Sequence, residues 1–163
     1  MQRIQMSEFS VYLQQRPGEL AGVLDAAKGA GVRITSISTT EYQDRGCVRL
    51  LGTPEQSLRL MCESLVDAGI GPIVEAQVIG VGVENRPGMI RDLSVLMADN
   101  RINIRYCYLI PAVEGIDGPV CVFRFDEHDR AMDLIDGADW PESDLTCAAE
   151  GDSENDSQGE SAA

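Results

Sequence analysis

The sequence predicts an α+β protein made of two copies of one β-α-β-β-α-β unit, followed by an acidic tail. Three observations lead to this fold class. The triplet Arg-Pro-Gly stands at residues 16–18 and again at residues 86–88, seventy positions later. Each triplet follows a stretch in which apolar and polar residues alternate, as in a half-buried strand. Each also precedes apolar residues spaced as on one face of a helix.

The repeat extends beyond the triplets. When the chain is shifted by seventy residues, FSVYLQQRPGELAGVLDAAKGAGVRI lies over IGVGVENRPGMIRDLSVLMADNRINI. Few residues are identical, but the apolar positions coincide. Because a conserved spacing of apolar positions is what specifies a supersecondary unit, the chain is expected to contain two copies of one such unit.

The first copy begins with a strand in which Phe9, Val11 and Leu13 alternate with polar residues. Pro17 and Gly18 end this strand, and a proline is tolerated where a helix begins because that backbone position needs no N–H. The apolar face of the following helix consists of Leu20, Val23, Leu24 and Ala27. Gly29 and Gly31 end the helix.

A hairpin and a second helix complete the first copy. VRITSIST is rich in β-branched residues and predicts a strand, QDRG predicts a turn, and CVRLLG predicts the next strand. Thr53 or Pro54 then opens a helix. Its apolar face consists of Leu58, Met61, Cys62, Leu65 and Val66. PIVEAQVIGVGV predicts a long extended segment that completes the first sheet and runs directly into the first strand of the second copy.

The second copy repeats this order. Ile90, Leu93 and Met97 mark the first helix face, INIRYCYLI and PVCVFRF predict strands around the longer turn AVEGIDG, and a short helix ends at Gly137. The last strand is weakly indicated. ADWPESDLTCA contains a proline and three acidic residues, so only a short edge segment is expected there.

This order of elements gives a four-stranded antiparallel sheet with two helices on one face, the ferredoxin-like arrangement. We expect the first unit to span residues 8–77 and the second to span residues 78–148. Residues 149–163 contain no large apolar side chain and are expected to form a disordered acidic tail that mainly solvates the protein.

Composition limits the possible functions. Hydrophobic residues make up 44% of the chain, no apolar stretch is long enough to cross a membrane, and the N-terminus has no signal-peptide core. A cytoplasmic protein is therefore expected. The formal net charge is −14, and residues 139–163 carry eight acidic residues and no basic one. A nucleic-acid backbone is excluded as a partner on these grounds.

The cysteines and the one histidine do not indicate a metal site. The five cysteines include no C-x-x-C pair, and they are interpreted as small buried hydrophobic residues rather than as a redox or metal site. They are Cys47, Cys62, Cys107, Cys121 and Cys147. His128 has no cysteine near it in sequence and is interpreted as a solvated residue at a helix start.

Given these turns and this element order, residues 8–145 resemble the ACT domain. The resemblance is carried by the apolar strand, by RPGEL or NRPGMI, by the amphipathic helix, and by VRI or INI at the start of the next strand. The chain is similar to a small group of proteins that consist of two ACT domains. The family implies binding of a small effector, usually an amino acid, where ACT units pair. Side-by-side pairing implies one joined sheet of eight strands.

The Pro-Gly turns are the predicted ligand sites. A helix start presents unpaired backbone N–H groups and a partial positive charge, so the carboxylate of an amino acid can dock there. A glycine at this point lets a ligand approach closely. In the first copy the candidate residues are Gln15, Arg16, Pro17, Gly18 and Leu20, the last of them as an apolar wall.

The second copy is the favoured site. The family implies that a polar residue at the start of the second strand of the partner unit contacts the ligand; the second copy has Asn103 there, and the first has Arg33. The candidate residues are Asn85, Arg86, Pro87, Gly88, Met89, Ile90 and Asn103. In the alternative interpretation, the Pro-Gly turn only starts a helix and Asn103 is a surface residue.

Other classes of function have less support. No nucleophile with a base, carboxylate pair or metal cluster appears, so no catalytic residues and no cofactor are expected. GVGVENRPG is not a dinucleotide loop, because G-x-G-x-x-G needs a glycine where Asn85 stands. RNA binding needs exposed aromatic residues on a basic face; Tyr106 and Tyr108 are instead expected to pack under a helix or against the other unit.

The sequence therefore predicts a non-catalytic regulatory protein that binds a small effector, an amino acid, at the interface between ACT units. An exposed edge strand favours a homodimer. The absence of a catalytic domain implies a separate catalytic subunit as partner. The alternative is a ligand-free interaction module that acts as the regulatory subunit of another enzyme, such as acetolactate synthase.

Overall fold

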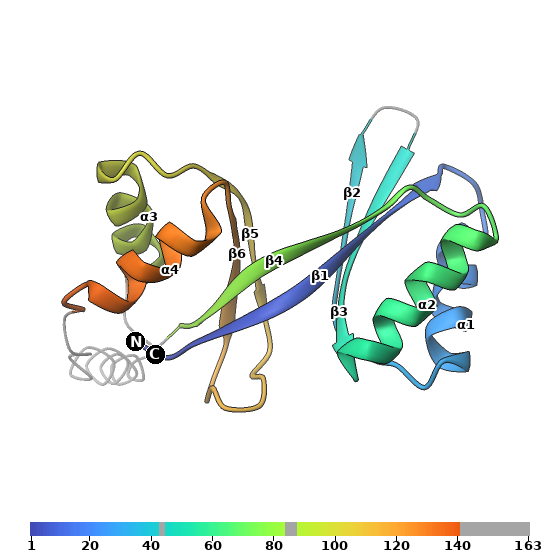
Figure 1. Cartoon of the computed structure of the whole chain (residues 1–163), viewed down its shortest axis with the longest axis horizontal. Helices are drawn as coiled ribbons and strands as arrows, with labels where there is room; N and C mark the ends of the chain where they lie inside the picture. Colours follow the sequence, from blue (N-terminus) through green and yellow to red (C-terminus); the bar gives the residue numbers. More distant parts are fainter. Residues whose placement is uncertain (43–44, 84–87, 141–163) are drawn as a thin grey trace, which may run out of the picture.

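The computed structural model describes residues 1–42, 45–83 and 88–140. Strands and helices alternate in the order that the repeat predicts (Figure 1). The strands are β1 (Arg3–Gln14), β2 (Arg33–Tyr42), β3 (Arg45–Thr53), β4 (Ile73–Gly82), β5 (Ile104–Ile110) and β6 (Val120–Phe125). The helices are α1 (Glu19–Gly29), α2 (Glu55–Asp67), α3 (Met89–Asp99) and α4 (His128–Gly137).

The described strands form one antiparallel sheet in the order β2-β3-β1-β4-β6-β5. β1 and β4 are long, lie at the centre and pair with each other over most of their length (Figure 1). β3 pairs with β1 only from Phe9 onward, and β6 pairs with β4 only from Ile79 onward. Each central strand therefore contributes one half to the first unit and one half to the second.

This sharing explains why the described sheet has six strands and not the eight that two complete units would supply. The first unit uses β2, β3, the second half of β1 and the first half of β4. The second unit uses β5, β6, the second half of β4 and the first half of β1. Residues 3–7 of β1 thus lie beside β4 where the fourth strand of the second copy was expected. The segment predicted to form that strand, from Pro141 onward, lies outside the described residues.

β1 begins earlier than the first unit was expected to begin. Its first half contains Ile4 and Met6 in alternation with polar residues, so the strand pattern is visible in the sequence. Both side chains pack against an apolar cluster between the two units. The predicted first unit, which starts at residue 8, does not include residues 3–7 of this strand.

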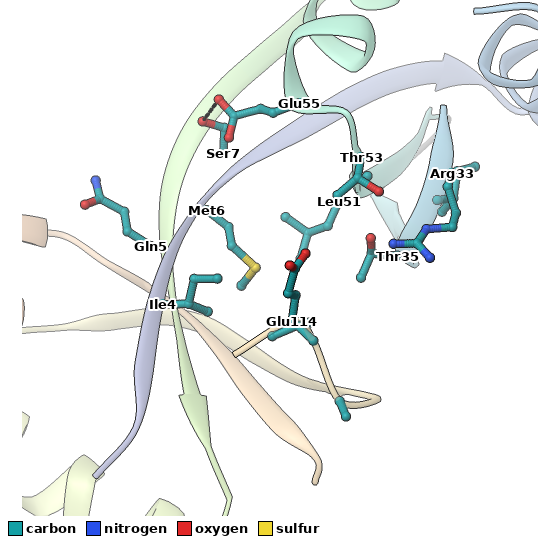
Figure 2. A pocket seen from close by; sticks show the side chains of 14 residues that line it. Ile4, Gln5, Met6, Ser7, Arg33, Thr35, Leu51, Thr53, Glu55 and Glu114 are labelled. Carbon is teal, nitrogen blue, oxygen red and sulfur yellow. Dashed lines mark hydrogen bonds between the residues drawn. The ribbon is translucent and has the colours of Figure 1, made fainter. Parts of the chain in front are cut away.

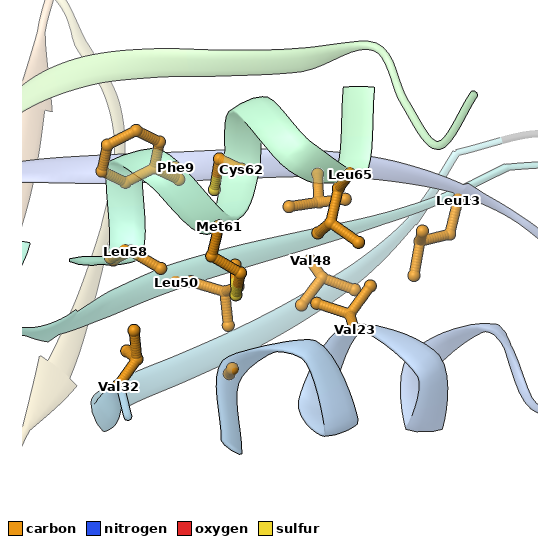
Figure 3. Close-up of a cluster of buried hydrophobic side chains, with 12 residues drawn as sticks. Phe9, Leu13, Val23, Val32, Val48, Leu50, Leu58, Met61, Cys62 and Leu65 are labelled. Atoms are coloured by element: carbon orange, nitrogen blue, oxygen red, sulfur yellow. The ribbon is translucent and has the colours of Figure 1, made fainter. Parts of the chain in front are cut away.

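Each unit has its own core between two helices and one face of the sheet. In the first unit the core includes Val23 of α1, Leu50 of β3 and Leu58 of α2, all fully buried (Figure 3). In the second unit Leu93 and Met97 of α3 are fully buried. Val23 and Leu93 are equivalent positions under the seventy-residue shift, so the structure confirms the repeat.

The predicted helix faces are correct at their centres and too wide at their edges. Leu20 and Leu24 of α1 are 39% and 36% exposed, and Val66 of α2 is 51% exposed. These side chains lie at the margin of each apolar stripe, where a single sheet does not reach around the helix. The other two residues of the predicted α1 face, Val23 and Ala27, are buried.

The described cysteines largely follow the prediction. Cys47, Cys62 and Cys121 are buried, Cys107 is exposed, and all four are free thiols. Burial raises the pKa of the Cys62 thiol to about 11 and that of the Cys121 thiol to about 12. Cys147 lies outside the described residues.

Thiol labelling is therefore expected to be selective. Because the thiolate is the reactive form, iodoacetamide at neutral pH should modify Cys107 first and leave Cys47, Cys62 and Cys121 protected in the folded protein. Peptide mass spectrometry after timed labelling measures this order, and urea-unfolded protein is the control in which all four react. Labelling of Cys62 or Cys121 as fast as Cys107 would contradict the described packing.

His128 starts α4 as predicted, but it is half-buried and not solvated. Neither ring nitrogen has a hydrogen-bond partner among the described residues, and burial lowers the pKa of the imidazole. No group of acidic, cysteine or histidine side chains in the described part of the chain is placed to hold a metal ion. No helix in that part combines the length and apolar character that crossing a membrane requires.

Candidate functional site

The two units meet on the face of the sheet opposite the helices. An apolar cluster there combines residues of both units: Leu51 of β3 packs with Val78 of β4, Ile110 of β5 and Val122 of β6. The loop between β5 and β6, the predicted longer turn, adds Ile116 to the same cluster. The sheet is twisted strongly enough that strands far apart in its order come together on this face (Figure 1).

A buried carboxylate lies in this inter-unit contact. Glu8 of β1 is fully buried. The hydroxyl of Tyr106 donates a hydrogen bond to one of its oxygens at 2.5 Å, and the hydroxyl of Tyr108 donates one to the other. Both tyrosines come from β5 of the second unit, so the carboxylate ties β5 to β1. Of the two predicted surroundings of Tyr106 and Tyr108, a helix or the other unit, the structure shows the second.

Arg49 of β3 completes this cluster of Glu8, Arg49, Tyr106 and Tyr108. Its guanidinium lies over the ring of Tyr106, 4.3 Å from the centroid, and its Nε lies 4.0 Å from the Glu8 carboxylate. Burial, and then the adjacent Glu8, raise the pKa of Tyr106 to about 12 and also raise the pKa of Tyr108. Both phenols are therefore neutral hydrogen-bond donors at neutral pH.

A cavity of about 470 Å³ opens beside this cluster, between the two units (Figure 2). That volume is within the range of small-molecule sites, roughly 300–1,000 Å³. The first half of β1, the start of β2 and the end of β3 form its walls, together with the start of α2 and the β5–β6 loop. The lining residues used below are Ile4, Met6, Ser7, Arg33, Thr35, Leu51, Thr53, Glu55, Val113 and Glu114.

The three charged residues of the cavity differ in their pairing. Glu55 is already compensated, because its Oε1 accepts hydrogen bonds from the hydroxyl of Ser7 at 3.0 Å and from Nη2 of Arg59 at 2.8 Å. Arg33 and Glu114 are exposed and form no ion pair or side-chain hydrogen bond with any described residue. Arg33 belongs to the first unit and Glu114 to the second. Within the described part of the chain, the cavity thus offers one cation and one anion without a partner, each from a different unit.

Helices begin directly after Gly18 and Gly88, as the sequence indicated. Gly18 and Gly88 precede α1 and α3 with φ values of 94° and 93°, a left-handed conformation that favours glycine. Gln15, Arg16 and Pro17 are exposed beside Gly18. Asn85, Arg86 and Pro87 lie outside the described residues.

The structure does not bring each turn together with the second strand of its own unit. Gly88 follows β4, whose end pairs with the start of β6, whereas Asn103 precedes β5, whose start pairs with the end of β6. The two residues therefore lie at opposite ends of the second unit. Asn103 is exposed, Ile90 is half-buried and Met89 is buried in the core of the second unit. A ligand contact that joins a turn to Asn103 of a partner unit stays a prediction.

The equivalent position in the first unit, Arg33, lies in the inter-unit cavity. Sequence reasoning noted Arg33 but favoured the second copy, and it missed Glu114 altogether. Glu114 stands in AVEGIDG, where a charged residue in a turn carries no signal of its own. Glu8 was missed too, because it stands between Ser7 and Phe9, before the apolar alternation that predicted the strand, and nothing local in the sequence indicates that it is buried.

The ACT domain pair family model matches residues 4–140, so the chain belongs to the ACT domain pair family. Protein BT0572 from Bacteroides thetaiotaomicron has a similar fold, with a TM-score of 0.67, 18% identity and coverage of 82% of this chain and 88% of that one. The ligand-free regulatory subunit of aspartate kinase from Thermus thermophilus has a TM-score of 0.53, 15% identity and coverage of 82% and 94%.

A structure of aspartokinase alpha and beta subunits is similar at a TM-score of 0.52, with 16% identity and coverage of 83% of this chain and 95% of that one. At these identities the likeness shows the fold. Among curated proteins, none matches the sequence significantly.

Proposed function

We propose that this protein is a non-catalytic regulatory protein that binds a small effector, an amino acid, at the interface between its two ACT units and regulates amino-acid metabolism. The observation that supports this function most directly is the cavity between the units, which carries an arginine and a glutamate that have no charged partner among the described residues. A zwitterion satisfies both charges, whereas a simple anion or cation satisfies only one.

The regulatory mechanism follows from the position of the cavity. A ligand bound by both units stabilises one arrangement of them relative to others, and it shifts the population by the difference in its affinities for those arrangements. A partner that binds one arrangement better then reads the ligand concentration, because the two binding equilibria are linked. The Pro-Gly turns and Asn103 remain a second proposed contact for the effector, in an assembly of more than one chain.

The proposed partner is a separate catalytic subunit, in the cytoplasm. Two structures of similar fold are described as a regulatory subunit of aspartate kinase and as aspartokinase alpha and beta subunits, which is consistent with an enzyme of amino-acid metabolism as the partner. The outer edges of β2 and β5 are unpaired within the described chain, and a homodimer through one of them is proposed.

Thermal unfolding of the full chain against each of the twenty amino acids at millimolar concentration tests the effector. A ligand at 100 times its Kd adds about 2.7 kcal/mol to the free energy of unfolding. For a domain of this size that amount raises the Tm by several degrees. We expect one or two amino acids to do so. If none of the twenty raises the Tm, amino-acid binding is wrong.

A ligand-free interaction module, such as a regulatory subunit of acetolactate synthase, is the second candidate. Ile37 on β2 and Leu109 on β5 favour it, since they are 44% and 60% exposed on the two edge strands. This candidate predicts no amino-acid effect on Tm. It also predicts that replacing Leu109 with lysine weakens self-association or binding of a catalytic subunit, as measured by light scattering and co-purification.

A further inference from the structure

We infer that the cavity between the units is a two-sided clamp for a zwitterion, in which Arg33 binds the ligand carboxylate and Glu114 binds its ammonium group. This assignment rests on the proposed function. It adds the location of the site, the two residues that recognise the ligand, and the two elements that the bound ligand links. It differs from the predicted site at the Pro-Gly turns.

The charge pairing inside the cavity carries the assignment. Glu55 lines the same wall region as Ser7, but its carboxylate is already held by Ser7 and Arg59. Arg33 and Glu114 are the charged lining residues that lack a partner among the described residues. A guanidinium pairs with a carboxylate through two parallel hydrogen bonds, and a carboxylate readily accepts hydrogen bonds from an ammonium group. A ligand with both groups leaves neither residue unpaired.

The remaining lining residues suit the rest of such a ligand. Met6 and Leu51 point into the cavity and provide apolar contact, and the hydroxyl-bearing Thr35 lies between Arg33 and Glu114 (Figure 2). Residues 4–7 of β1 line another wall, and on this side of the strand β3 begins to pair only at Phe9. Because no described strand pairs with residues 4–7 on this side, backbone N–H and C=O groups along this edge of β1 are available to a ligand. A ligand of mixed polar and apolar character fits this lining.

Glu114 is held in place by the structure on either side of it. Val113 and Ile116 form an isolated β-bridge, and the N–H of Ile116 donates to the carbonyl of Val113 at 3.1 Å. Gly115 supplies the left-handed conformation of this turn with φ of 88°. Val113 and Ile116 both pack into the inter-unit apolar cluster. A ligand bound to both Glu114 and Arg33 therefore links a fixed turn of the second unit to β2 of the first unit.

The cavity also adjoins the buried cluster that joins the units. Successive residues of a strand alternate between faces, so Met6 shares a face with Glu8, and Leu51 shares one with Arg49. Two side chains that contact the ligand are thus next to two side chains that fix β5 against β1 and β3. Occupation of the clamp is expected to stabilise the same arrangement of the units that the cluster stabilises.

The test combines variants of the protein with variants of the ligand. Arg33→Gln and Glu114→Gln are compared with Arg45→Gln and Glu41→Gln, which change the charge equally at exposed positions outside the cavity. The probes are the twenty L-amino acids and, for each one that raises the Tm, its amide and its N-acetyl derivative. Calorimetric titration gives the Kd. Arg33→Gln and Glu114→Gln are each expected to weaken binding at least tenfold, and the two control variants less than twofold.

The decisive comparison removes a charged group from the ligand and the matching charge from the protein, first separately and then together. The amide lacks the carboxylate, so it should bind wild-type protein at least tenfold more weakly than the amino acid but bind Arg33→Gln no more weakly than the amino acid does. The N-acetyl derivative, which lacks the ammonium group, should behave in the same way with Glu114→Gln. If an amino acid binds but the amide and the N-acetyl derivative lose as much affinity for the variants as for the wild-type protein, the clamp is wrong while the proposed function stands. If no amino acid binds, the proposed function fails first.

Discussion

Replacing Glu8 with alanine is expected to lower the free energy of unfolding by about 3–5 kcal/mol, the typical cost of removing one partner of a buried charged cluster. The substitution leaves the hydroxyls of Tyr106 and Tyr108 without their shared acceptor, and it leaves Arg49 without the carboxylate beside it. Nε of Arg49 is buried without a hydrogen bond among the described residues, so the guanidinium would keep only its Nη1 hydrogen bond to Thr40 and its contact with the ring of Tyr106. Urea unfolding at pH 7 measures the change.

Two milder variants keep this prediction testable if the alanine variant does not fold. Glu8→Gln retains the volume and one carbonyl oxygen, so it should cost less than Glu8→Ala. Tyr108→Phe removes one donor to a charged acceptor and should cost about 1.5–3 kcal/mol. Glu41→Ala, at an exposed position on the same sheet, should change stability by less than about 0.5 kcal/mol. A cost below 1 kcal/mol for Glu8→Ala would show that the cluster does not hold the units together.

Replacing Gly80 with alanine is expected to destabilise the protein by about 1–3 kcal/mol, through overpacking where the two units cross. A Cβ at this position of β4 would lie 2.7 Å from Cε of Met6, 2.9 Å from Cγ1 of Val120 and 3.0 Å from Cγ2 of Ile4. The end of Met6 is flexible and can move. Val120 and Ile4 are β-branched and have few alternative rotamers, so the backbone of the shared strands must shift.

Gly46→Ala is the matched control for this prediction. Gly46 lies in β3, in the same sheet, but a Cβ there would meet no atom within 4 Å. Alanine restricts the unfolded chain more than glycine does, so this variant should gain roughly 0.5–1 kcal/mol. The two Gly→Ala changes are therefore expected to have opposite signs. The cost at Gly80 should also shrink in a Val120→Ala background, and equal effects at Gly80 and Gly46 would contradict the packing described here.

Both predictions concern the same region, because the units are joined by shared strands and not by a linker. Ile79 and Gly80 of β4 pair with β6 on one side and with the first half of β1 on the other. A disturbance there reaches the cavity through Ile4 and Met6, which contact the Gly80 position and also line the cavity. We therefore expect Gly80→Ala to weaken effector binding as well as stability.

Much of the fold follows from local patterns in the sequence. The apolar spacing of Val23 and Ala27, repeated at Leu93 and Met97, specifies two equivalent helices. Alternation at Phe9, Val11 and Leu13 specifies a strand with one apolar face, although residues 7–11 of β1 are buried on both faces. Glycine at positions 18 and 88 fits the left-handed start of each helix. These features depend on contacts within a few residues or on the burial of one face of an element. Both leave a pattern that can be recognised in a single sequence.

The arrangement of the units was decided by the tertiary structure. Residues 3–7 pair with residues 77–81 of β4, which lie 70 to 78 positions later in the sequence. Neither segment contains a local pattern that indicates the other as its partner. The same holds for Glu8 with Tyr106 and Tyr108, which are 98 and 100 residues away in sequence. From the sequence alone, Arg33 is predicted only to start a strand and Glu114 only to lie in a turn. They share a cavity only because two shared strands fold the second unit against the first, and that choice rests on the burial of apolar surface summed over both units.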